Sequence, residues 1–426
     1  MISMDSAINQ IIAETIPIKD IENISFNHLD RLNHRILARD VSAQIAVPPF
    51  RASIKDGYAV VTADGAGHRR VMTGLIAGPS KETIVLKPGF CTRISTGAAL
   101  PEGADAVVQV EDTSVIELTA DGEEAVVDIL KKPTVDQDIR PIGCDIQKGT
   151  TLIGGGTELG PIELGIMASA GVHSVPVLRR PVVAVLSTGD EILNPGQPLA
   201  FGQIWDSNRT TLLSILRESS VDVLDLGIAV DKVDDIFDRM RNGLNAADVL
   251  ITTGGVSMGE RDLIKQIIKT DFKADIHFGR VNLKPGKPTT FATCALNDRK
   301  KYIFGLPGNP ISAFVTFHLF VKPLLTRISG RVWSQDSALD ITTYQRTLSV
   351  RLNTGADSYK LDERPEFARA VLSYQLNDVP IARMTGNQSS SRLMSAKDAD
   401  ALVLLPARSE SLQVIKSGHI VTALLI

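Results

Sequence analysis

Residues 181–328 alternate between short apolar runs and amphipathic segments, and this alternation limits the possible folds more than any other feature of the chain. The run at 182–187 is rich in β-branched residues, and from about Ser207 apolar residues recur at helical spacing. Similar pairs of strand and helix follow at 221–247, 248–270 and 301–317. Strands joined in this way run parallel and carry helices on both faces of their sheet. Such sheets bind ligands at the carboxyl ends of their strands.

The remaining parts of the chain have other patterns. Residues 47–150 hold short strand-like runs separated by Gly, Pro and Asp, which predicts a β-rich module. An amphipathic helix is expected at 3–16, and a helix followed by a strand at 161–177. The last segment alternates in apolar character, which favours a small β-barrel or a sandwich. We therefore expect a multidomain α/β protein with four parts: 1–46 together with 151–180, 47–150, 181–330 and 331–426.

Charge and cysteine content favour a globular protein of a reducing compartment. The 426 residues carry a formal net charge of −4, so no global basic field indicates a nucleic-acid partner. The three cysteines lie far apart and form no CxxC pair, which argues against a thiolate metal site. Residues 1–16 contain no basic n-region of a signal peptide. The apolar stretch at 311–325 is interrupted by His318 and Lys322, so we expect a cytoplasmic protein without membrane insertion.

Two loops have the composition of an anion site. Asn309 is a good N-cap for the helix that follows it, and helix initiation alone explains its presence. It does not explain Pro307 and Gly308, which shape the loop before the helix so that free N–H groups face a ligand, preferably an anion. Lys284 and Lys287 lie on another loop, stiffened by prolines. Either lysine alone would be interpreted as a solvated charge, but the pair suits a small dianion.

The strand at 248–253 runs into Gly254 and Gly255, and a hydroxyl and two carboxylates follow. These are Ser257, Glu260 and Asp262. Small residues clear space at the end of a strand, so this turn is a candidate site. Asp262 could also cap the next helix. Of the two acids, Asp262 is the better catalytic candidate.

Two further polar clusters follow predicted strands. Thr188, Asp190 and Glu191 offer hard oxygen ligands that suit Mg²⁺ beside a phosphate, and a solvated turn is the alternative interpretation. The cluster at 206–208 begins a helix, where capping accounts for most of what is seen. The chain has no GxxxxGK[ST] motif and no dinucleotide fingerprint. A Walker-type nucleotidase and a standard NAD enzyme are therefore both disfavoured.

An ordered set of motifs spans nearly the whole chain: "PPFRASIKDGYAV", "STGAALPEGADAVVQVEDT", "DIRPIGCDIQKG", "LSTGDE", "DSNRTTLL", "TTGGVSMGERD", "KPGKPTTFA" and "GLPGNPISA". Together they resemble the molybdopterin molybdenumtransferase family, which comprises MoeA and the gephyrin E domain. In the last segment, "RPEFARAVL" and "TGNQSSSRLMSAKDADALVLLP" resemble the animal gephyrin E-domain branch in particular. One such motif is a weak signal, whereas the ordered set is specific.

The resemblance implies an elongated homodimer of four subdomains. These are a doubly wound, parallel-sheet molybdopterin-binding domain, a β-rich inserted domain, an extended helical and strand dimerisation domain and a C-terminal small β-barrel. The implied reaction inserts molybdenum from molybdate into the dithiolene of adenylylated molybdopterin, with hydrolysis of the adenylate and with Mg²⁺ involved. The adenylylating (G-type) domain of eukaryotic relatives is not repeated here, so a partner or another portion of a longer chain would supply the substrate.

The resemblance also implies which residues form the site. Ser257 and Asp262 match catalytic positions, and Asp262 could hold Mg²⁺ or orient the attacking water. Further acidic positions of the family match Asp56, Asp145, Asp190 and Glu191; Asp190 is also the other expected Mg²⁺ ligand. Molybdate would be held by Lys284, Lys287, Pro288, Ser312, Arg369 and Ser395. Adenylylated molybdopterin would contact Thr96, Thr188, Asp190, Asp206, Ser207, Asn208, Gly254, Gly255, Pro307, Gly308 and Asn309.

Two alternatives to the enzyme remain at this point. A scaffold of the gephyrin type would anchor inhibitory glycine or GABA-A receptors by binding a receptor loop peptide. Ile8, Phe367 and Ala407 stand where gephyrin has a phenylalanine, a tyrosine and a proline of its receptor-binding region, and these departures argue against receptor anchoring. A generic nucleotide or sugar-phosphate enzyme on the same sheet is suggested by the fold alone.

Overall fold

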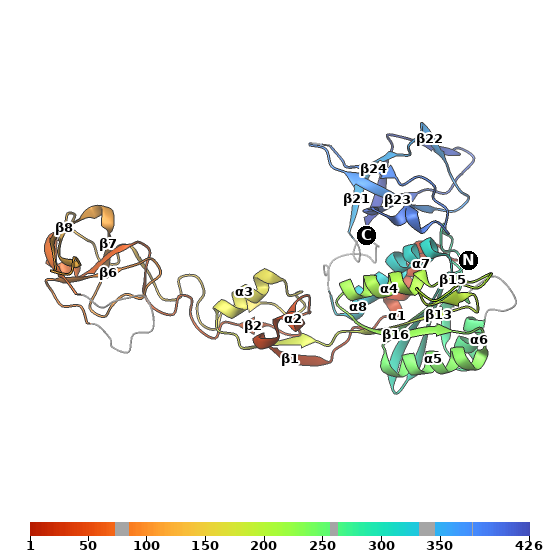
Figure 1. Cartoon of the computed structure of the whole chain (residues 1–426), viewed down its shortest axis with the longest axis horizontal. Helices are drawn as coiled ribbons and strands as arrows, with labels where there is room; N and C mark the ends of the chain where they lie inside the picture. The colour runs from red at the N-terminus through yellow and green to blue at the C-terminus, as the bar shows by residue number, and fades with distance from the viewer. Residues whose placement is uncertain (73–84, 256–262, 332–345, 377) are drawn as a thin grey trace.

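The computed structural model describes residues 1–72, 85–255, 263–331, 346–376 and 378–426. The molecule is elongated (Figure 1). A β-rich module lies at one end, a narrow arm follows, and an α/β unit with a β-barrel packed on it forms the other end. This arrangement already separates residues 47–150 from the strands that were expected to carry the site.

The central sheet of the α/β unit has six strands in the order β16-β13-β17-β20-β19-β18. The first four run parallel, as the alternation of strands and helices predicted. The last two run antiparallel and form an edge that the alternation did not reveal. Asn297 and Asp298, both with positive φ, make the tight turn between β19 and β20. The strands are β13 (Val182–Thr188), β16 (Asp222–Ala229), β17 (Val249–Thr253), β18 (Asp275–Phe278), β19 (Thr290–Leu296) and β20 (Arg299–Leu306).

Alternate side chains of each central strand enter two different cores, which is why these strands are apolar throughout. Val183 and Val185 pack in one core, and Ala184 and Leu186 in the other. Figure 1 shows the first face covered by α1, α4, α7 and α8, and the second by α5 and α6. The helices are α1 (Met4–Glu14), α4 (Ser207–Glu218), α5 (Val233–Ala246), α6 (Leu263–Thr270), α7 (Pro310–Thr316) and α8 (Lys322–Ile328).

The helical stretch Pro310–Ile328, which comprises α7, a π-helical turn at Phe317–Val321 and α8, is long and apolar enough to cross a membrane. However, 78% of its most apolar window is buried inside the protein, against the sheet and α1. Its composition is therefore that of a core helix.

The arm is built from segments on both sides of the β-rich stretch. β1 (Ile21–Ser25) pairs with β12 (Ser174–Leu178), and β2 (Val41–Ser42) pairs with β11 (Thr151–Ile153). Short helices α2 (Leu29–Leu32) and α3 (Pro161–Ser169) complete it. The chain thus passes along the arm, forms the distant module and returns.

The distant module has a six-stranded sheet in the order β7-β4-β6-β5-β9-β8. Its strands are β4 (Gly57–Val60), β5 (Gly67–Val71), β6 (Phe90–Ile94), β7 (Ala106–Gln109), β8 (Thr113–Leu118) and β9 (Glu124–Ile129). A small ladder of β3 (Ala52–Ser53) and β10 (Ile139–Arg140) connects it to the arm. The expectation of many short strands separated by turns is confirmed.

The C-terminal segment is a closed barrel, so of the barrel and the sandwich the barrel is correct. Its strand order is β21-β24-β23-β25-β27. Main-chain hydrogen bonds attach the barrel to the α/β unit: Lys284 N donates to Pro365 O at 2.8 Å, and Phe367 N donates to Lys284 O at 2.8 Å. The strands are β21 (Thr347–Asn353), β23 (Glu366–Ser373), β24 (Ile381–Met384), β25 (Ala401–Leu405) and β27 (Ile420–Leu425).

Candidate anion-binding site

A cavity of about 530 Å³ lies where the α/β unit meets the barrel. The loop at 284–288 and the first turn of α7 form one side of it, and residues 387–390 of the barrel form another. Four of the six residues expected to hold molybdate line it: Lys284, Lys287, Pro288 and Ser312. Residues far apart in the sequence therefore converge on one polar cavity.

The loop that carries the two lysines is pressed against α7. Gly286 has φ +109°, and a Cβ atom there would lie 2.3 Å from Cγ2 of Thr316. The hydroxyl of Thr289 donates to Gly286 O at 2.6 Å, which closes the turn. Only glycine fits this close approach, and the tight turn directs both lysines to the same cavity.

The two lysines differ in their surroundings. The ammonium of Lys284 lies 3.3 Å from Oδ2 of Asp362 and 3.2 Å from Oε2 of Glu366. Glu366 is only 1% exposed, and its other oxygen accepts a hydrogen bond from the hydroxyl of Tyr359 at 3.1 Å. Among the described residues, no carboxylate lies within 4 Å of the Lys287 ammonium. Lys287 is thus the less neutralised of the two cations.

Arg369 and Ser395, the other two residues expected to hold molybdate, lie behind the cavity wall. Arg369 is completely buried, and its Nε and Nη2 donate to Oγ of Ser395 at 3.2 and 3.1 Å. No described carboxylate lies within 4 Å of this guanidinium, and burial lowers the pKa of Arg369 to about 10. The nearby charge of Glu366 opposes this shift only in part. A buried cation that is compensated only in part is costly unless an anion accompanies it.

Gln388 links this buried pair to the cavity. Its Oε1 accepts from Arg369 N at 2.8 Å, and its Nε2 donates to Arg369 O at 3.2 Å. Gln388 itself lines the cavity. Sequence reasoning did not identify Gln388, Tyr359, Arg364 or Glu366; Arg364 and Glu366 stand in the "RPEF" segment that was quoted for the resemblance.

A second group of expected residues meets at the carboxyl edge of the sheet. Asn208 donates from Nδ2 to Gly308 O at 2.7 Å, while its Oδ1 is buried and has no hydrogen-bond partner among the described residues. Oγ1 of Thr188 is likewise buried and unpartnered. A Cβ atom on Gly255 would lie 2.9 Å from that hydroxyl, and one on Gly254 would lie 2.4 Å from Thr188 O. These glycines allow three loops to come together around unsatisfied polar atoms.

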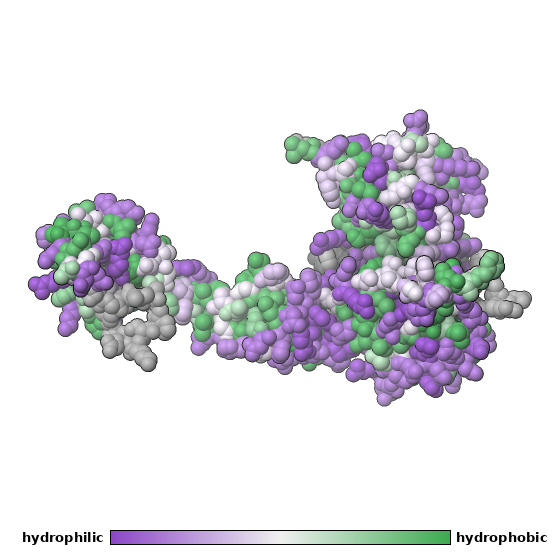
Figure 2. Space-filling model, in the orientation of Figure 1, coloured by the Kyte–Doolittle hydropathy of each residue, from purple (hydrophilic) through white to green (hydrophobic). Residues whose placement is uncertain are grey.

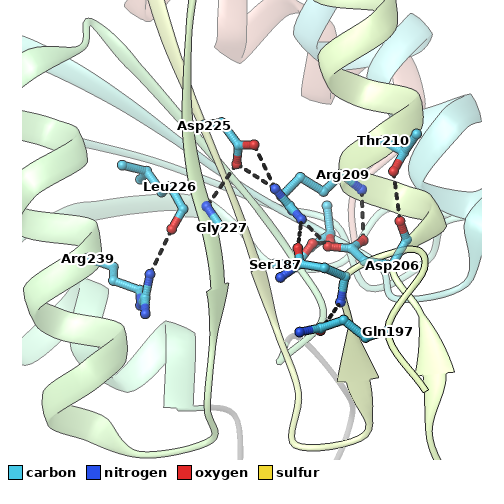
Figure 3. Close-up of polar contacts among 11 residues, drawn as sticks. Ser187, Gln197, Asp206, Arg209, Thr210, Asp225, Leu226, Gly227 and Arg239 are labelled. Atoms are coloured by element: carbon cyan, nitrogen blue, oxygen red, sulfur yellow. Dashed lines mark hydrogen bonds and ion pairs between the residues drawn. The ribbon is translucent and has the colours of Figure 1, made fainter. Parts of the chain in front are cut away.

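Asp206 serves mainly to hold this edge in place, as Figure 3 shows. Its Oδ1 accepts from Arg209 N at 3.0 Å and so caps α4, and its Oδ2 lies 3.0 Å from Arg209 Nε. The same guanidinium also binds both carboxylate oxygens of Asp225, at 2.8 and 2.7 Å. Ser207 begins α4 directly after this cap. Pro307 is buried, and Asn309 donates from Nδ2 to Oγ of Ser390 at 3.1 Å.

Carboxylates gather beyond the end of β13. Asp190 Oδ1 accepts from Asp231 N at 3.0 Å. The pKa of Asp231 is raised by burial and by the negative charges of Asp190 and Glu191. Within the described ranges, no three His, Cys, Asp or Glu residues are arranged to hold a metal ion by themselves. Ser257 and Asp262 lie outside the described residues.

The remaining expected catalytic and binding residues lie at the other end of the molecule. Asp56 and Thr96 are in contact in the distant module, with Thr96 N donating to Asp56 Oδ1 at 2.9 Å. Asp145 forms an ion pair with Arg140 near the junction of module and arm. Figure 1 shows this end of the chain far from the α/β unit and the barrel, whose residues line the cavity. A single chain therefore does not bring these three residues to the anion site.

Two positions compared with the receptor-binding region of gephyrin are inside the protein. Ile8 and Phe367 are each 2% exposed and belong to the core that joins α1, the sheet and the barrel. Both side chains are used for packing.

Comparison with known families gives three matches along the chain. Residues 2–171 match the MoeA N-terminal region (domain I and II), residues 184–327 match a probable molybdopterin binding domain, and residues 354–426 match the MoeA C-terminal region (domain IV). Together these matches extend over most of the sequence.

Several proteins with related sequences are molybdenum cofactor proteins. The chain is 38% identical over 410 residues to the Drosophila melanogaster molybdenum cofactor synthesis protein cinnamon, covering 96% of the chain and 65% of that protein. It is 36% identical to Dictyostelium discoideum gephyrin, covering 92% of the chain but 58% of that protein. The molybdopterin molybdenumtransferase of Bacillus subtilis is 35% identical, with 92% of the chain and 87% of that enzyme covered. The chain therefore spans less than two thirds of the first two proteins but most of the bacterial enzyme.

The fold has a counterpart among solved structures. The molybdopterin biosynthesis moea protein of Pyrococcus horikosii superposes with a TM-score of 0.77 at 28% identity, covering 100% of this chain and 99% of that one. The expected fold class, a multidomain α/β protein with a C-terminal barrel, is thereby confirmed. By sequence and by structure, the chain belongs to the molybdopterin molybdenumtransferase family.

Proposed function

We propose that the chain inserts molybdenum from molybdate into adenylylated molybdopterin, with release of AMP. The observation that carries this proposal is the buried guanidinium of Arg369, which is hydrogen-bonded to a hydroxyl and has no described carboxylate within 4 Å, behind a cavity lined by two lysines. Such an arrangement suits a tetrahedral dianion, because charge and hydroxyl donors are present and thiolates are not required.

Molybdate would bind between the loop at 284–288 and the first turn of α7. Lys287 would supply the less neutralised charge and Ser312, with Pro288 beside it, a hydroxyl donor at the helix start. The Arg369–Ser395 pair would complete the site from behind Gln388 after a small rearrangement of the wall. In this arrangement the anion adds to the negative charge of Glu366, which compensates Arg369 only in part.

Adenylylated molybdopterin would lie along the carboxyl edge of the sheet. Thr188 and Asn208 each present a buried oxygen that no described residue hydrogen-bonds, and Gly254, Gly255 and Gly308 let the backbone approach the ligand. Asp206 and Ser207 would support Asn208 from the helix start, and Pro307 and Asn309 would shape the opposite loop. Thr96 would contribute from the distant module.

Ser257 and Asp262, which follow Gly254 and Gly255 in the sequence, are the proposed catalytic residues. Asp262 would orient the water that hydrolyses the adenylate. Asp190 and Asp262 would hold Mg²⁺, which neutralises negative charge on the pyrophosphate when bound. One or two carboxylates with substrate phosphates are the usual ligands of this ion, so a complete protein cage is not required. Glu191 adds to the negative field at that edge.

We further propose a homodimer, because one chain leaves the site incomplete. Asp56, Thr96 and Asp145 would come from the module of a second copy. The arm offers an apolar surface for association: Ile162 on α3 is 71% exposed, and Figure 2 shows apolar side chains over this part of the arm. The activated substrate would be supplied by an adenylylating domain or protein.

The decisive test is Asp262→Asn in the full chain. The variant should bind molybdate and adenylylated molybdopterin as the unchanged protein does, but should release no AMP and form no cofactor. Glu260→Gln, two residues away in the sequence, is the matched control and should retain activity. Full molybdate-dependent cofactor formation by Asp262→Asn would contradict the proposed function.

A further inference from the structure

The buried carboxylate of Glu366 lies directly beneath the anion cavity. It is 1% exposed, and its two oxygens have one partner each: the Lys284 ammonium at 3.2 Å and the Tyr359 hydroxyl at 3.1 Å. The pKa of Tyr359 is raised by burial and by the charge of Glu366, so the phenol stays a neutral donor. Both partners line the cavity. Glu366 therefore acts on the cavity through Lys284 and Tyr359.

The surroundings of the cavity carry a small excess of positive charge. Four cations contribute, namely Lys284, Lys287, Arg364 and the buried Arg369. Two carboxylates oppose them: Glu366, which binds Lys284, and Asp362, which binds Lys284 and lies 3.2 Å from Arg364. Four positive and two negative charges leave an excess of two, equal in magnitude to the charge of a molybdate ion.

The ammonium of Lys284, which is expected to bind the anion, already contacts two carboxylates. The main chain of Lys284 is already paired with the barrel through Pro365 and Phe367, so the carboxylates act on its ammonium and not on its backbone. The two carboxylates weaken anion binding, because an oxyanion near Lys284 must compete with Glu366 for the same ammonium. A cargo that must be passed on to the dithiolene gains nothing from an excessively stable resting complex, since tighter ground-state binding raises the barrier to the next step.

We infer that Glu366 is a positioning residue that limits the affinity of the cavity for its oxyanion, so that molybdate is bound selectively and then released to the pterin. This inference rests on the proposed function. The carboxylate does not touch the reacting atoms; it shares Lys284 with the incoming anion and so sets how firmly that anion is held. Removing its charge should tighten binding, whereas the loss of a purely structural contact would loosen it.

The test uses Glu366→Gln in the full chain, with sodium molybdate as the calorimetric probe at low ionic strength. Glutamine keeps the acceptor for Tyr359 but loses the negative charge. The dissociation constant for molybdate should fall roughly three- to twentyfold, and the difference should shrink in high salt, as expected for a unit charge close to a dianion. Glu366→Asp, which restores the charge, should bring the constant back to within about threefold of the unchanged protein.

Turnover supplies an independent readout. With adenylylated molybdopterin present, Glu366→Gln should lower both KM for molybdate and kcat, because the anion is held too firmly to move on. The matched control is Glu363→Gln, which removes a charge from a neighbouring side chain that is 75% exposed and paired with Arg408. That variant should leave both constants unchanged.

The outcomes separate the inference from the function on which it rests. Equal or weaker molybdate binding by Glu366→Gln, with normal binding by the unchanged protein, would overturn the inference and leave the proposed function standing. Absence of molybdate binding in every variant and in the unchanged protein would overturn both. If Glu366→Gln does not fold, Asp362→Asn removes the other carboxylate on Lys284 and must show the same tightening for the inference to hold.

Discussion

The guanidinium of Arg369 lies against the hydroxyl of Ser395, with Nε and Nη2 at 3.2 and 3.1 Å from one oxygen, in a position closed to solvent. Folding thus buries a cation whose hydrogen bonds to described residues go to neutral oxygens, including the carbonyl of Phe367 at 3.3 Å, while Glu366 compensates its charge only in part. Burial lowers the pKa of Arg369, which expresses the same unfavourable cost of desolvating its charge. Such a residue is retained at the expense of stability when its charge is needed for a ligand.

Replacing Arg369 should therefore separate stability from binding. We expect Arg369→Met to weaken molybdate binding at least tenfold while the free energy of unfolding stays within about 1 kcal/mol of the unchanged protein or rises. Calorimetric titration and urea denaturation measure the two quantities. Ser395→Ala serves as the comparison, since it leaves the cation with fewer acceptors and should lower stability by about 1 kcal/mol. A loss of 3 kcal/mol or more in Arg369→Met would show that the arginine is a structural residue.

The glycine between the two lysines should be sensitive to the smallest enlargement. Gly286→Ala places a methyl group 2.3 Å from Thr316 and forces a side chain into a positive φ, so the lysine loop must move away from α7. We expect the free energy of unfolding to fall by roughly 2 kcal/mol or more and molybdate to bind more weakly. Gly418→Ala is the matched control, because Gly418 has φ +95° but open space around its missing Cβ. It should cost about 1 kcal/mol and leave binding unchanged; equal effects of the two variants would show that the contact with Thr316 is unimportant.

Replacing Asn208 should weaken the binding of one of the two proposed substrates and not of the other. Its Nδ2 ties α4 to Gly308, and its Oδ1 is buried with no hydrogen-bond partner in the described ranges. Asn208→Ala should weaken retention of adenylylated molybdopterin about tenfold, as expected for loss of a buried hydrogen-bonding group, and should leave the affinity for molybdate alone unchanged. Equilibrium dialysis with each compound measures both. Ser214→Ala, on the exposed side of the same helix, is the control, and equal losses for both substrates would contradict the separate assignment.

The buried His318 should make the free energy of unfolding depend on pH. Desolvation, with a smaller contribution from Lys322, lowers the pKa of His318 to about 3, whereas an unfolded histidine titrates near 6.5. The unfolded chain therefore holds more protons between these values. Stability from this group is complete above about pH 6.5 and is lost as the pH falls through the window, by about 1.4 kcal/mol per pH unit. Between pH 6.5 and 5, His318→Gln should reduce the slope of the free energy of unfolding against pH by about the contribution of one proton, as measured by urea denaturation. The control is His419→Gln, at an exposed position, which should leave that slope unchanged. An unchanged slope in His318→Gln would contradict the assignment.

Local pattern was sufficient to predict the α/β unit. Its central strands are apolar on both faces because helices cover both, and its helices show apolar residues at helical spacing. The antiparallel edge of β18 and β19 was missed, although the polar run at 297–301 separates β19 from β20 and is typical of a hairpin turn. The barrel was predicted only as one of two options, since alternation of side chains does not reveal whether a sheet closes.

For the site, the lysine loop and the start of α7 could be identified from glycine, proline and lysine in the sequence, because their chemistry and backbone constraints are local. Arg369 and Ser395 were indicated by family resemblance alone. Nothing near them in sequence explains their pairing, which arises from the contact between β23 and the short helix at Leu393–Ala396. Glu366 was not identified at all, because a carboxylate becomes a counter-ion only when the barrel brings it within 3.2 Å of Lys284.

The sequence by itself determined the order of elements, the type of each and the kinds of chemical groups that end the strands, since these depend on residue periodicity and local backbone geometry. Tertiary structure alone decided which groups share a cavity, which charge is neutralised and which is left without a partner. It also decided that Asp56, Thr96 and Asp145 lie far from the cavity within one chain. The physical reason is that burial and electrostatic interaction depend on distances in space, and these are fixed only when the barrel, the sheet and the arm have packed together.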